Sequence, residues 1–207
     1  MRNGLLGSFA RYVSLNVLGM LALSFYILAD TFFVANGLGT AGLTALNLAI
    51  SVYSFIHGTG LMLGIGGATR YSIQKSGCSS AFEGNRTFSA AVHLSVILGS
   101  MLFIIGAFFP RQLAELLGAN AETVDMTTTY LRTILCFAPA FIINNVLIAF
   151  IRNDGSPRTA MTGMLVGSLS NIVLDYIFIF PMQMGMFGAA FATGLAPLIS
   201  IAVMAPY

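Results

Sequence analysis

SNIVLDYIFIF, residues 170–180, lies inside an apolar run that extends from Thr159 to Pro181. A run of this length can cross a bilayer as a helix, which takes about 20 residues. An ionised carboxylate costs several kcal/mol in hydrocarbon, so the side chain of Asp175 is expected to face protein or water and not lipid. Asn171 precedes it by four residues, which places both side chains on one face of a helix. This polar stripe predicts a site for a proton, a cation or a polar substrate.

The composition is that of a protein with many membrane spans. Of the 207 residues, 57% are hydrophobic and 8% are charged, whereas soluble domains carry about 25% charged residues. The net charge of +2 is too small and too scattered for a nucleic-acid-binding surface. The two cysteines, Cys78 and Cys136, have neither the spacing of a metal site nor that of a disulfide framework. No nucleophile elbow, phosphate loop or zinc-protease motif is present, so an enzyme is not expected.

Six apolar stretches predict six transmembrane helices. Each has about the length that a tilted helix needs, and the connections between them are short and rich in Gly, Asn, Ser and Thr. Stretches this long and this apolar favour helices over the strands of a barrel. We therefore expect one all-α integral membrane domain over residues 1–207. The predicted spans are residues 12–34, 47–69, 88–109, 127–150, 159–181 and 187–206.

The basic residues predict the orientation of these helices, because cytoplasmic loops are enriched in Lys and Arg. Only Arg111 and Arg132 belong to the opposite side of the predicted spans. Both termini are therefore expected in the cytoplasm, with the protein in the inner (plasma) membrane. The other seven of the nine basic residues fall on the cytoplasmic side: Arg2, Arg11, Arg70, Lys75, Arg86, Arg152 and Arg158.

Four polar side chains in three predicted spans converge at a similar depth. Asp30, Asp175 and Thr193 lie four to six residues from the outer ends of their spans, which is about 6–9 Å at the rise of an α-helix. Asn171 is one turn deeper. Their oxygens suit a hard monovalent cation or a shared proton and not a soft metal. We predict a cation- or proton-binding site at these four residues, with Na⁺ or H⁺ as its ion and no other cofactor.

Each candidate also has a purely structural interpretation. Asp30 can reach the outer interface by local bilayer thinning, Asn171 can bond between helices, and Thr193 can bond the preceding turn of its own helix. The two histidines, His57 and His93, are isolated in the sequence and are interpreted as residues at helix interfaces.

Small and amide residues leave further alternatives open. Gly60 with Gly64, and Gly163 with Gly167, form small-xxx-small pairs, which either line a moving cavity or allow close packing of two helices. The pair at residues 144–145, Asn-Asn, either lines a cavity or bonds between helices.

Several segments together resemble the multidrug and toxic compound extrusion (MATE) family, and they occur in the family's order over nearly the whole chain. Each motif is loose when taken alone, and Ser51 stands where many relatives have a proline. The segments are Asp30-Thr31-Phe32-Phe33-Val34 followed by Gly39, Gly64-Ile65-Gly66-Gly67-Ala68, Arg152-Asn153-Asp154-Gly155-Ser156-Pro157-Arg158, Asn171-Ile172-Val173-Leu174-Asp175-Tyr176 and Gly185-Met186-Phe187-Gly188-Ala189-Ala190-Phe191-Ala192-Thr193.

The resemblance implies a transporter of twelve transmembrane helices in two six-helix lobes, which exchanges Na⁺ or H⁺ for lipophilic cationic drugs across the lipid bilayer. In the family's amino-terminal lobe, the cation site uses an Asp of the first helix, an Asn and an Asp one turn apart on the fifth, and a Thr of the sixth. These positions match Asp30, Asn171, Asp175 and Thr193. The sequence ends after its sixth predicted span, so we expect one lobe of an efflux antiporter, whose partner is the missing second lobe or another chain.

Three alternatives remain open. A related flippase for lipid-linked sugars would need basic residues inside its spans to hold a pyrophosphate, and only Arg132 lies within one. An intramembrane hydrolase would need His93 within hydrogen-bond reach of a serine such as Ser168. A non-transporting subunit that only packs against partner helices would be undisturbed by Asp175→Leu.

Overall fold

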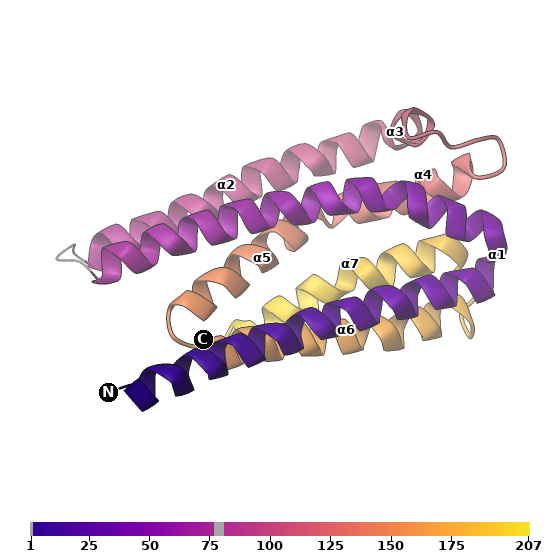
Figure 1. Cartoon of the computed structure of the whole chain (residues 1–207). Helices are drawn as coiled ribbons and strands as arrows, with labels where there is room; N and C mark the ends of the chain where they lie inside the picture. The colour runs from indigo at the N-terminus through magenta and orange to yellow at the C-terminus, as the bar shows by residue number, and fades with distance from the viewer. Residues whose placement is uncertain (1, 77–80) are drawn as a thin grey trace.

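The described part of the chain is helical almost throughout. The computed structural model describes residues 2–76 and 81–207, with side chains from residue 13 onward except at 15, 16, 22, 23, 81 and 82. Cys78 lies outside this part. In Figure 1 the long helices run roughly parallel or antiparallel to one another. They are α1 (Arg2–Ser76), α2 (Ala81–Phe108), α3 (Pro110–Leu116), α4 (Val124–Cys136), α5 (Ala138–Asn153), α6 (Pro157–Ile179) and α7 (Gly185–Met204).

The longest helix, α1, contains the first two predicted spans. It changes direction at Gly39, whose φ of 68° and ψ of −160° lie in a region open almost only to glycine. The limbs on either side, residues 2–38 and 40–76, run in opposite directions in Figure 1. This joint falls in the Gly-rich connection between the first two predicted spans. The single element α1 therefore consists of two helices, one for each of these spans.

The fourth predicted span, residues 127–150, is bent and not straight. Its two halves, α4 and α5, meet at Phe137 with an angle of 49°. Pro139 lies in the first turn of α5. A proline lacks the N–H of a helical residue, and its ring clashes with the carbonyl four residues earlier, so a straight helix is interrupted here. The short helix α3 precedes this pair and was not predicted.

Several helices are long and apolar enough to cross a membrane. Among the described residues there are four such helices, or five if the bent pair α4–α5 counts as one span. One of them is the 60-residue part of α1 from Val17 to Ser76. Measured along the chain, this part is about 90 Å long, roughly three times the hydrocarbon thickness of a bilayer. Because it folds back at Gly39, each of its two limbs can cross the membrane once. The chain is therefore an all-helical integral membrane protein.

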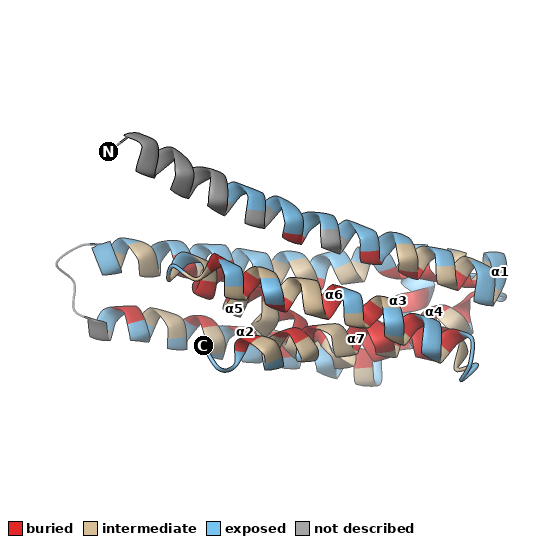
Figure 2. Ribbon diagram, turned by 90° about the horizontal axis from the view of Figure 1, so that it is seen from below, coloured by how far each residue is buried: buried red, intermediate tan, exposed pale blue. Residues whose placement is uncertain are grey.

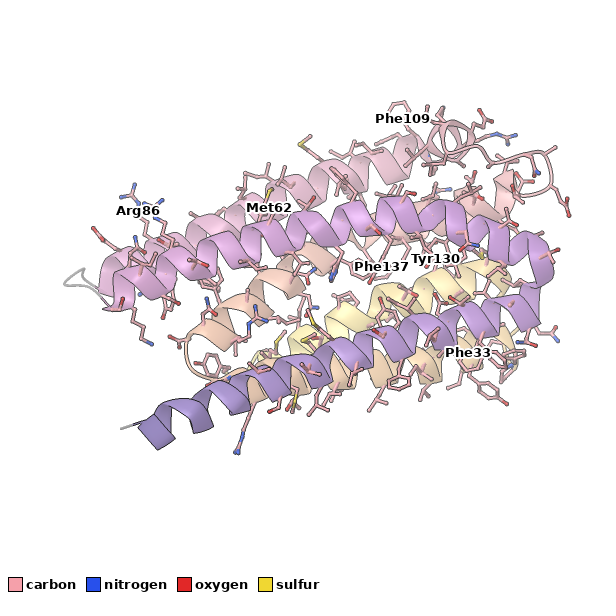
Figure 3. All side chains as sticks on the ribbon, in the orientation of Figure 1. Phe33, Met62, Arg86, Phe109, Tyr130 and Phe137 are labelled. Atoms are coloured by element: carbon pink, nitrogen blue, oxygen red, sulfur yellow. The ribbon has the colours of Figure 1, made fainter. Side chains whose placement is uncertain are left out.

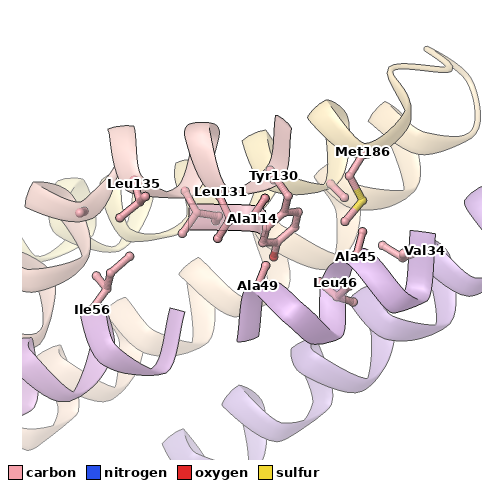
Figure 4. Packing of buried hydrophobic residues seen from close by; sticks show 14 of the residues in the cluster. Val34, Ala45, Leu46, Ala49, Ile56, Ala114, Tyr130, Leu131, Leu135 and Met186 are labelled. Atoms are coloured by element: carbon pink, nitrogen blue, oxygen red, sulfur yellow. The ribbon is translucent and has the colours of Figure 1, made fainter. Parts of the chain in front are cut away.

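The helices form two groups that α4 and α5 connect, since α5 contacts both α6 and α7. The first limb of α1 packs on α6 through Gly19 and Gly37, and α6 packs on α7. The second limb packs on α5, and both contact α2. α4 contacts α1, α2 and α7, and its residues Tyr130 and Leu131 belong to the largest apolar cluster, shown in Figure 4. In Figure 2, buried residues line the inner faces of these helices and exposed residues the outer faces.

Both small-xxx-small pairs are points of close helix packing. A Cβ atom added to Gly64 would lie 2.8 Å from the backbone oxygen of Asn145 on α5. One added to Gly167 would lie 3.1 Å from the backbone oxygen of Ala196 on α7. Backbone atoms cannot move aside as a side-chain end can, so these glycines set the distance between the helices.

Gly64→Ala is therefore expected to destabilise the fold by about 1–3 kcal/mol, the usual cost of overpacking. Gly66→Ala is the matched control, because a Cβ atom there has no neighbour within 4 Å, and the change should be neutral or stabilising by up to about 1 kcal/mol. Unfolding by heat or denaturant in detergent measures the difference. Equal stability of the two variants would contradict the packing role of Gly64.

Asp154, in the turn between α5 and α6, ties together three segments at one end of the bundle. Its Oδ1 accepts hydrogen bonds from the Tyr71 hydroxyl (2.7 Å) and the Lys75 ammonium (2.5 Å), and its Oδ2 accepts one from the Tyr207 hydroxyl (2.7 Å). These hydrogen bonds, that from Lys75 above all, lower the pKa of Asp154 from 3.8 to about 2. Because the folded pKa is depressed, any stability gained from these bonds is present above pH 4 and is lost as the pH falls through about 2.

Candidate cation site and adjoining cavity

The four predicted site residues are buried on three helices that pack together. Asp30 lies on the first limb of α1, Asn171 and Asp175 lie one turn apart on α6, and Thr193 lies on α7. Their exposed fractions are 6%, 0%, 0% and 3%, in that order. Since α6 contacts both α1 and α7, stretches distant in sequence meet at one place.

The amide of Asn171 connects Asp175 to α7. One orientation of this amide places Nδ2 3.4 Å from Oγ1 of Thr193. The reverse orientation lets Nδ2 donate to Oδ2 of Asp175 at 3.1 Å and lets the amide oxygen accept from the backbone N–H of Thr193 at 3.2 Å. We assign the reverse orientation, because a backbone N–H can only donate and therefore needs the amide oxygen facing it.

Each of the two carboxyl groups keeps one oxygen without a hydrogen bond among the described residues. These atoms are Oδ1 of Asp30 and Oδ1 of Asp175, and both are buried. The charge of Asp30 acts on Asp175, so the two groups share one electrostatic environment. A buried, ionised carboxyl group without a partner is unfavourable, and a second ionised carboxyl group nearby is unfavourable in addition because the two charges repel each other. A proton or a monovalent cation relieves both costs, and the hard oxygen atoms present fit either ion.

The donor set of the candidate site consists of oxygen ligands. Among the residues that the structure describes, no three or more His, Cys, Asp or Glu side chains form a group that could hold a metal ion. The site offers two carboxyl groups, one amide and one hydroxyl. These ligands are hard and carry at most two negative charges, which favours H⁺ or Na⁺.

Three tyrosines that no sequence pattern had indicated lie around the aspartates. The charge of Asp30 acts on Tyr26, Tyr53 and Tyr130. The hydroxyls of Tyr26 and Tyr53 bond to each other, and the side chain of Tyr130 lies near that of Thr193. Figure 3 labels Tyr130 in the interior of the bundle. Tyr26 precedes Asp30 by four residues, a spacing that could have revealed it, whereas packing alone brings the other two into place.

A cavity of about 410 Å³ adjoins this site. It is bounded by residues of α1, α5, α6 and α7, most of them apolar or aromatic, such as Phe141 and Met164. Tyr26 and Thr193 belong both to the cavity wall and to the surroundings of the aspartates. The volume lies within the range of about 300–1,000 Å³ that is typical of small-molecule sites.

The cavity wall also contains residues whose role the sequence left open. Asn144, Asn145 and His57 line it, and Asn145 in addition bonds His57 across the helix interface. Asn145 therefore both lines a cavity and bonds between helices, which were the two interpretations of the Asn-Asn pair. Arg152, in the last turn of α5, lines the cavity as well, although no basic residue was expected there.

The pair of residues that a hydrolase would need is not assembled. His93 is exposed on α2, and its Nδ1 lies 2.6 Å from the backbone oxygen of Ser89 in its own helix. α2 packs mainly on α1, α4 and α5, whereas Ser168 lies on α6 in the cavity wall. The described hydrogen bonds of the two histidines go to Ser89 and Asn145 and not to Ser168.

The chain is similar to known multidrug exporters in sequence and in fold. Multidrug export protein MepA of Staphylococcus saprophyticus is 32% identical over 158 residues, which cover 76% of this chain and 35% of MepA. An outward-facing multidrug resistance MATE family transporter of the MOP superfamily superposes with a TM-score of 0.83 and 31% identity, over 93% of this chain and 43% of that one. A MOP superfamily transporter from Pyrococcus furiosus, whose binding pocket has reverse polarity that suggests a different function, gives a TM-score of 0.85 and 30% identity over 94% and 43%.

The chain thus spans about two fifths of the length of these proteins, which corresponds to one lobe. The MatE family model matches residues 16–177. That range includes Asp30, Asn171 and Asp175, and Thr193 lies shortly after it. The all-helical membrane fold, the relatives and this match agree with one another, and the chain belongs to the MatE family.

Proposed function

We propose that this chain is the amino-terminal lobe of a multidrug efflux antiporter that couples drug export to Na⁺ or H⁺ entry. The MatE family is a family of transporters and not of enzymes. The single observation that carries the proposal is the pair of buried carboxyl groups beside a drug-sized cavity, each with an oxygen that no described residue satisfies. A structural role alone leaves these two oxygens unexplained.

The coupling between ion and drug follows from shared residues. When H⁺ or Na⁺ binds between Asp30 and Asp175, the like charges are neutralised and the first limb of α1, α6 and α7 can pack more closely. Tyr26 and Thr193 move with these helices and also form part of the cavity wall. Ion binding therefore changes the shape of the cavity, and by linkage the drug changes the affinity for the ion equally.

The cavity suits lipophilic cations with aromatic rings. Tyr26, Tyr53 and Phe141 supply ring surfaces, which bind apolar groups and attract cations over their faces. Met20 and Met164 are flexible and let one wall adapt to ligands of different shape. Such a wall favours a broad set of drugs over one substrate.

A second candidate is the lobe of a carrier for anionic lipid-linked substrates, and the position of Arg152 in the cavity wall favours it. A pyrophosphate group would pair with such a guanidinium. The drug proposal is preferred, because Arg152 is the one Lys or Arg among the described residues that line this cavity, and the two buried carboxyl groups oppose an anion.

The test is ethidium transport in proteoliposomes that contain this lobe joined to a second lobe of the family. Efflux that responds to an imposed pH or Na⁺ gradient supports the proposal. Efflux that is insensitive to both gradients contradicts ion coupling. Movement of a lipid-linked sugar in place of ethidium favours the second candidate.

We also propose that both termini face the cytoplasm, as the distribution of basic residues predicts. With Cys78 and Cys136 replaced by Ser, a cysteine at Ala121 is expected to react with an impermeant thiol reagent added outside the cell. A cysteine at Ser76, the last residue of α1, is expected to react only after the membrane is opened. The reverse labelling pattern would show that the orientation is inverted.

A further inference from the structure

The cavity contains one histidine whose ring is held on two sides. Nδ1 of His57 lies 3.1 Å from Nδ2 of Asn145. The imidazole stacks on Tyr53, with ring centroids 6.1 Å apart and planes inclined by 12°. Tyr53 in turn meets the ring of Phe141 edge-on, at 5.5 Å between centroids. His57 is therefore a fixed part of an aromatic wall and not a mobile side chain.

The contacts of Asn145 determine which nitrogen of His57 carries the proton. Nδ2 of Asn145 also lies 3.1 Å from the backbone oxygen of Phe141. A carbonyl oxygen only accepts, so the atom facing it is the NH₂ group, which donates one hydrogen to Phe141 and the other to Nδ1 of His57. Nδ1 is then an acceptor, and the neutral imidazole carries its proton on Nε2. Since no described residue bonds to Nε2, this N–H is a donor available to the cavity.

Two unpaired oxygens lie in the same cavity wall. Oδ1 of Asn144 and Oγ of Ser200 are buried without a hydrogen bond among the described residues. Ser200 is only 2% exposed. Both atoms are almost fully covered by protein, so a ligand in the cavity does not reach them in this conformation. The wall therefore offers one fixed donor, the Nε2–H of His57, beside a flat aromatic surface.

We propose that His57 determines ligand specificity in this cavity, and that its Nε2–H selects planar aromatic compounds carrying a hydrogen-bond acceptor such as a carbonyl oxygen. The inference rests on the proposed role of the cavity in drug binding. Tyr53 and Phe141 supply the surface against which the ring of the ligand packs. His57 is neutral while Asn145 donates to it, so it discriminates by hydrogen bonding and does not repel cationic rings.

The test compares xanthone with xanthene, which share one tricyclic frame but differ in having a carbonyl or a CH₂ group. Binding to the purified full chain in nanodiscs is measured by equilibrium dialysis, with protein-free nanodiscs subtracted. His57→Phe keeps a flat ring and removes the donor, so it should weaken xanthone binding about 3- to 10-fold, the worth of one hydrogen bond. Xanthene binding should change less than about twofold, since no hydrogen bond is lost.

Two matched variants complete the design. His57→Gln retains an amide donor and should recover part of the xanthone affinity. His93→Phe makes the same substitution on the exposed face of α2 and should leave both ligands unaffected. An equal loss of xanthone and xanthene in His57→Phe would show that His57 acts by packing and would overturn the inference, while leaving the cavity as a drug site. Failure of the unaltered chain to bind either compound would overturn both.

The position of the proton can be observed directly. The chain has two histidines, so ¹⁵N-histidine labelling gives two sets of signals, and His93→Phe assigns them. His57 is expected as the tautomer protonated at Nε2, and Asn145→Leu, which removes the donor to Nδ1, is expected to release that preference. Protonation of His57 at Nδ1 in the unaltered chain would overturn the inference independently of any ligand.

Discussion

Asp175→Asn, in a full-length transporter that contains this lobe, is expected to weaken strongly the drug efflux that an imposed pH or Na⁺ gradient drives. Asparagine matches aspartate in size but can neither exchange a proton nor neutralise a cation. The pocket then stays in its neutral state, and the coupling free energy between ion and drug is lost. Couplings between sites are typically about 1–3 kcal/mol, so the response to the gradient should fall about 5- to 150-fold. Ethidium flux in proteoliposomes measures it.

Asp30→Asn should have the same consequence, because the two carboxyl groups share one environment. Asp125→Asn is the control: Asp125 lies in the first turn of α4 with a side chain that is 87% exposed, and its replacement should leave efflux intact. All three variants should fold, since removal of a buried charge does not create a cavity. Full gradient-driven transport by both Asp30→Asn and Asp175→Asn would show that these residues are structural.

The sequence could indicate these candidate residues because a carboxylate is costly in hydrocarbon. This cost can be judged from the residue and its own predicted span, without knowledge of the neighbouring helices. Depth could be compared across spans because the rise of an α-helix is constant. The arrangement of the helices could not be obtained in this way. That α6 lies between α1 and α7 depends on close contacts at Gly19, Gly37 and Gly167, which are spread along the chain.

The breaks in the helices follow local backbone chemistry. The joint at Gly39 falls in a connection that the sequence did indicate, since glycine-rich segments interrupt helices. The bend at Phe137 also has a local signal in Pro139, which apolar composition alone conceals. By its apolar composition, the run at residues 127–150 was predicted as one span, whereas its backbone forms the two helices α4 and α5.

The cavity shows what single residues in a sequence cannot reveal. Asn145 and His57 are 88 positions apart, so no spacing rule connects them. His57 looked like an isolated histidine, and its partner became evident only where the second limb of α1 packs on α5. The tautomer of His57 depends in turn on a third group, the backbone carbonyl of Phe141.

Cells that express only this 207-residue chain are expected to retain ethidium as fully as cells without it. Alternating access requires two bundles that move about a central site, and the chain corresponds to one of them. Large apolar side chains such as Phe25, Phe32, Phe55 and Met62 are 63–66% exposed. Under the proposed function, lipid covers some of these surfaces and a second lobe covers others.

Ethidium accumulation in a strain without its own efflux pumps measures this difference. The chain alone should give the background level, whereas the same chain joined to a second lobe should lower accumulation in a manner that a protonophore or Na⁺ removal reverses. Immunoblots for the membrane fraction confirm that both forms are present. Strong efflux by the chain alone would contradict the prediction. Two copies related by a two-fold axis would then supply both bundles, and cross-linking between copies at Phe55→Cys should capture them.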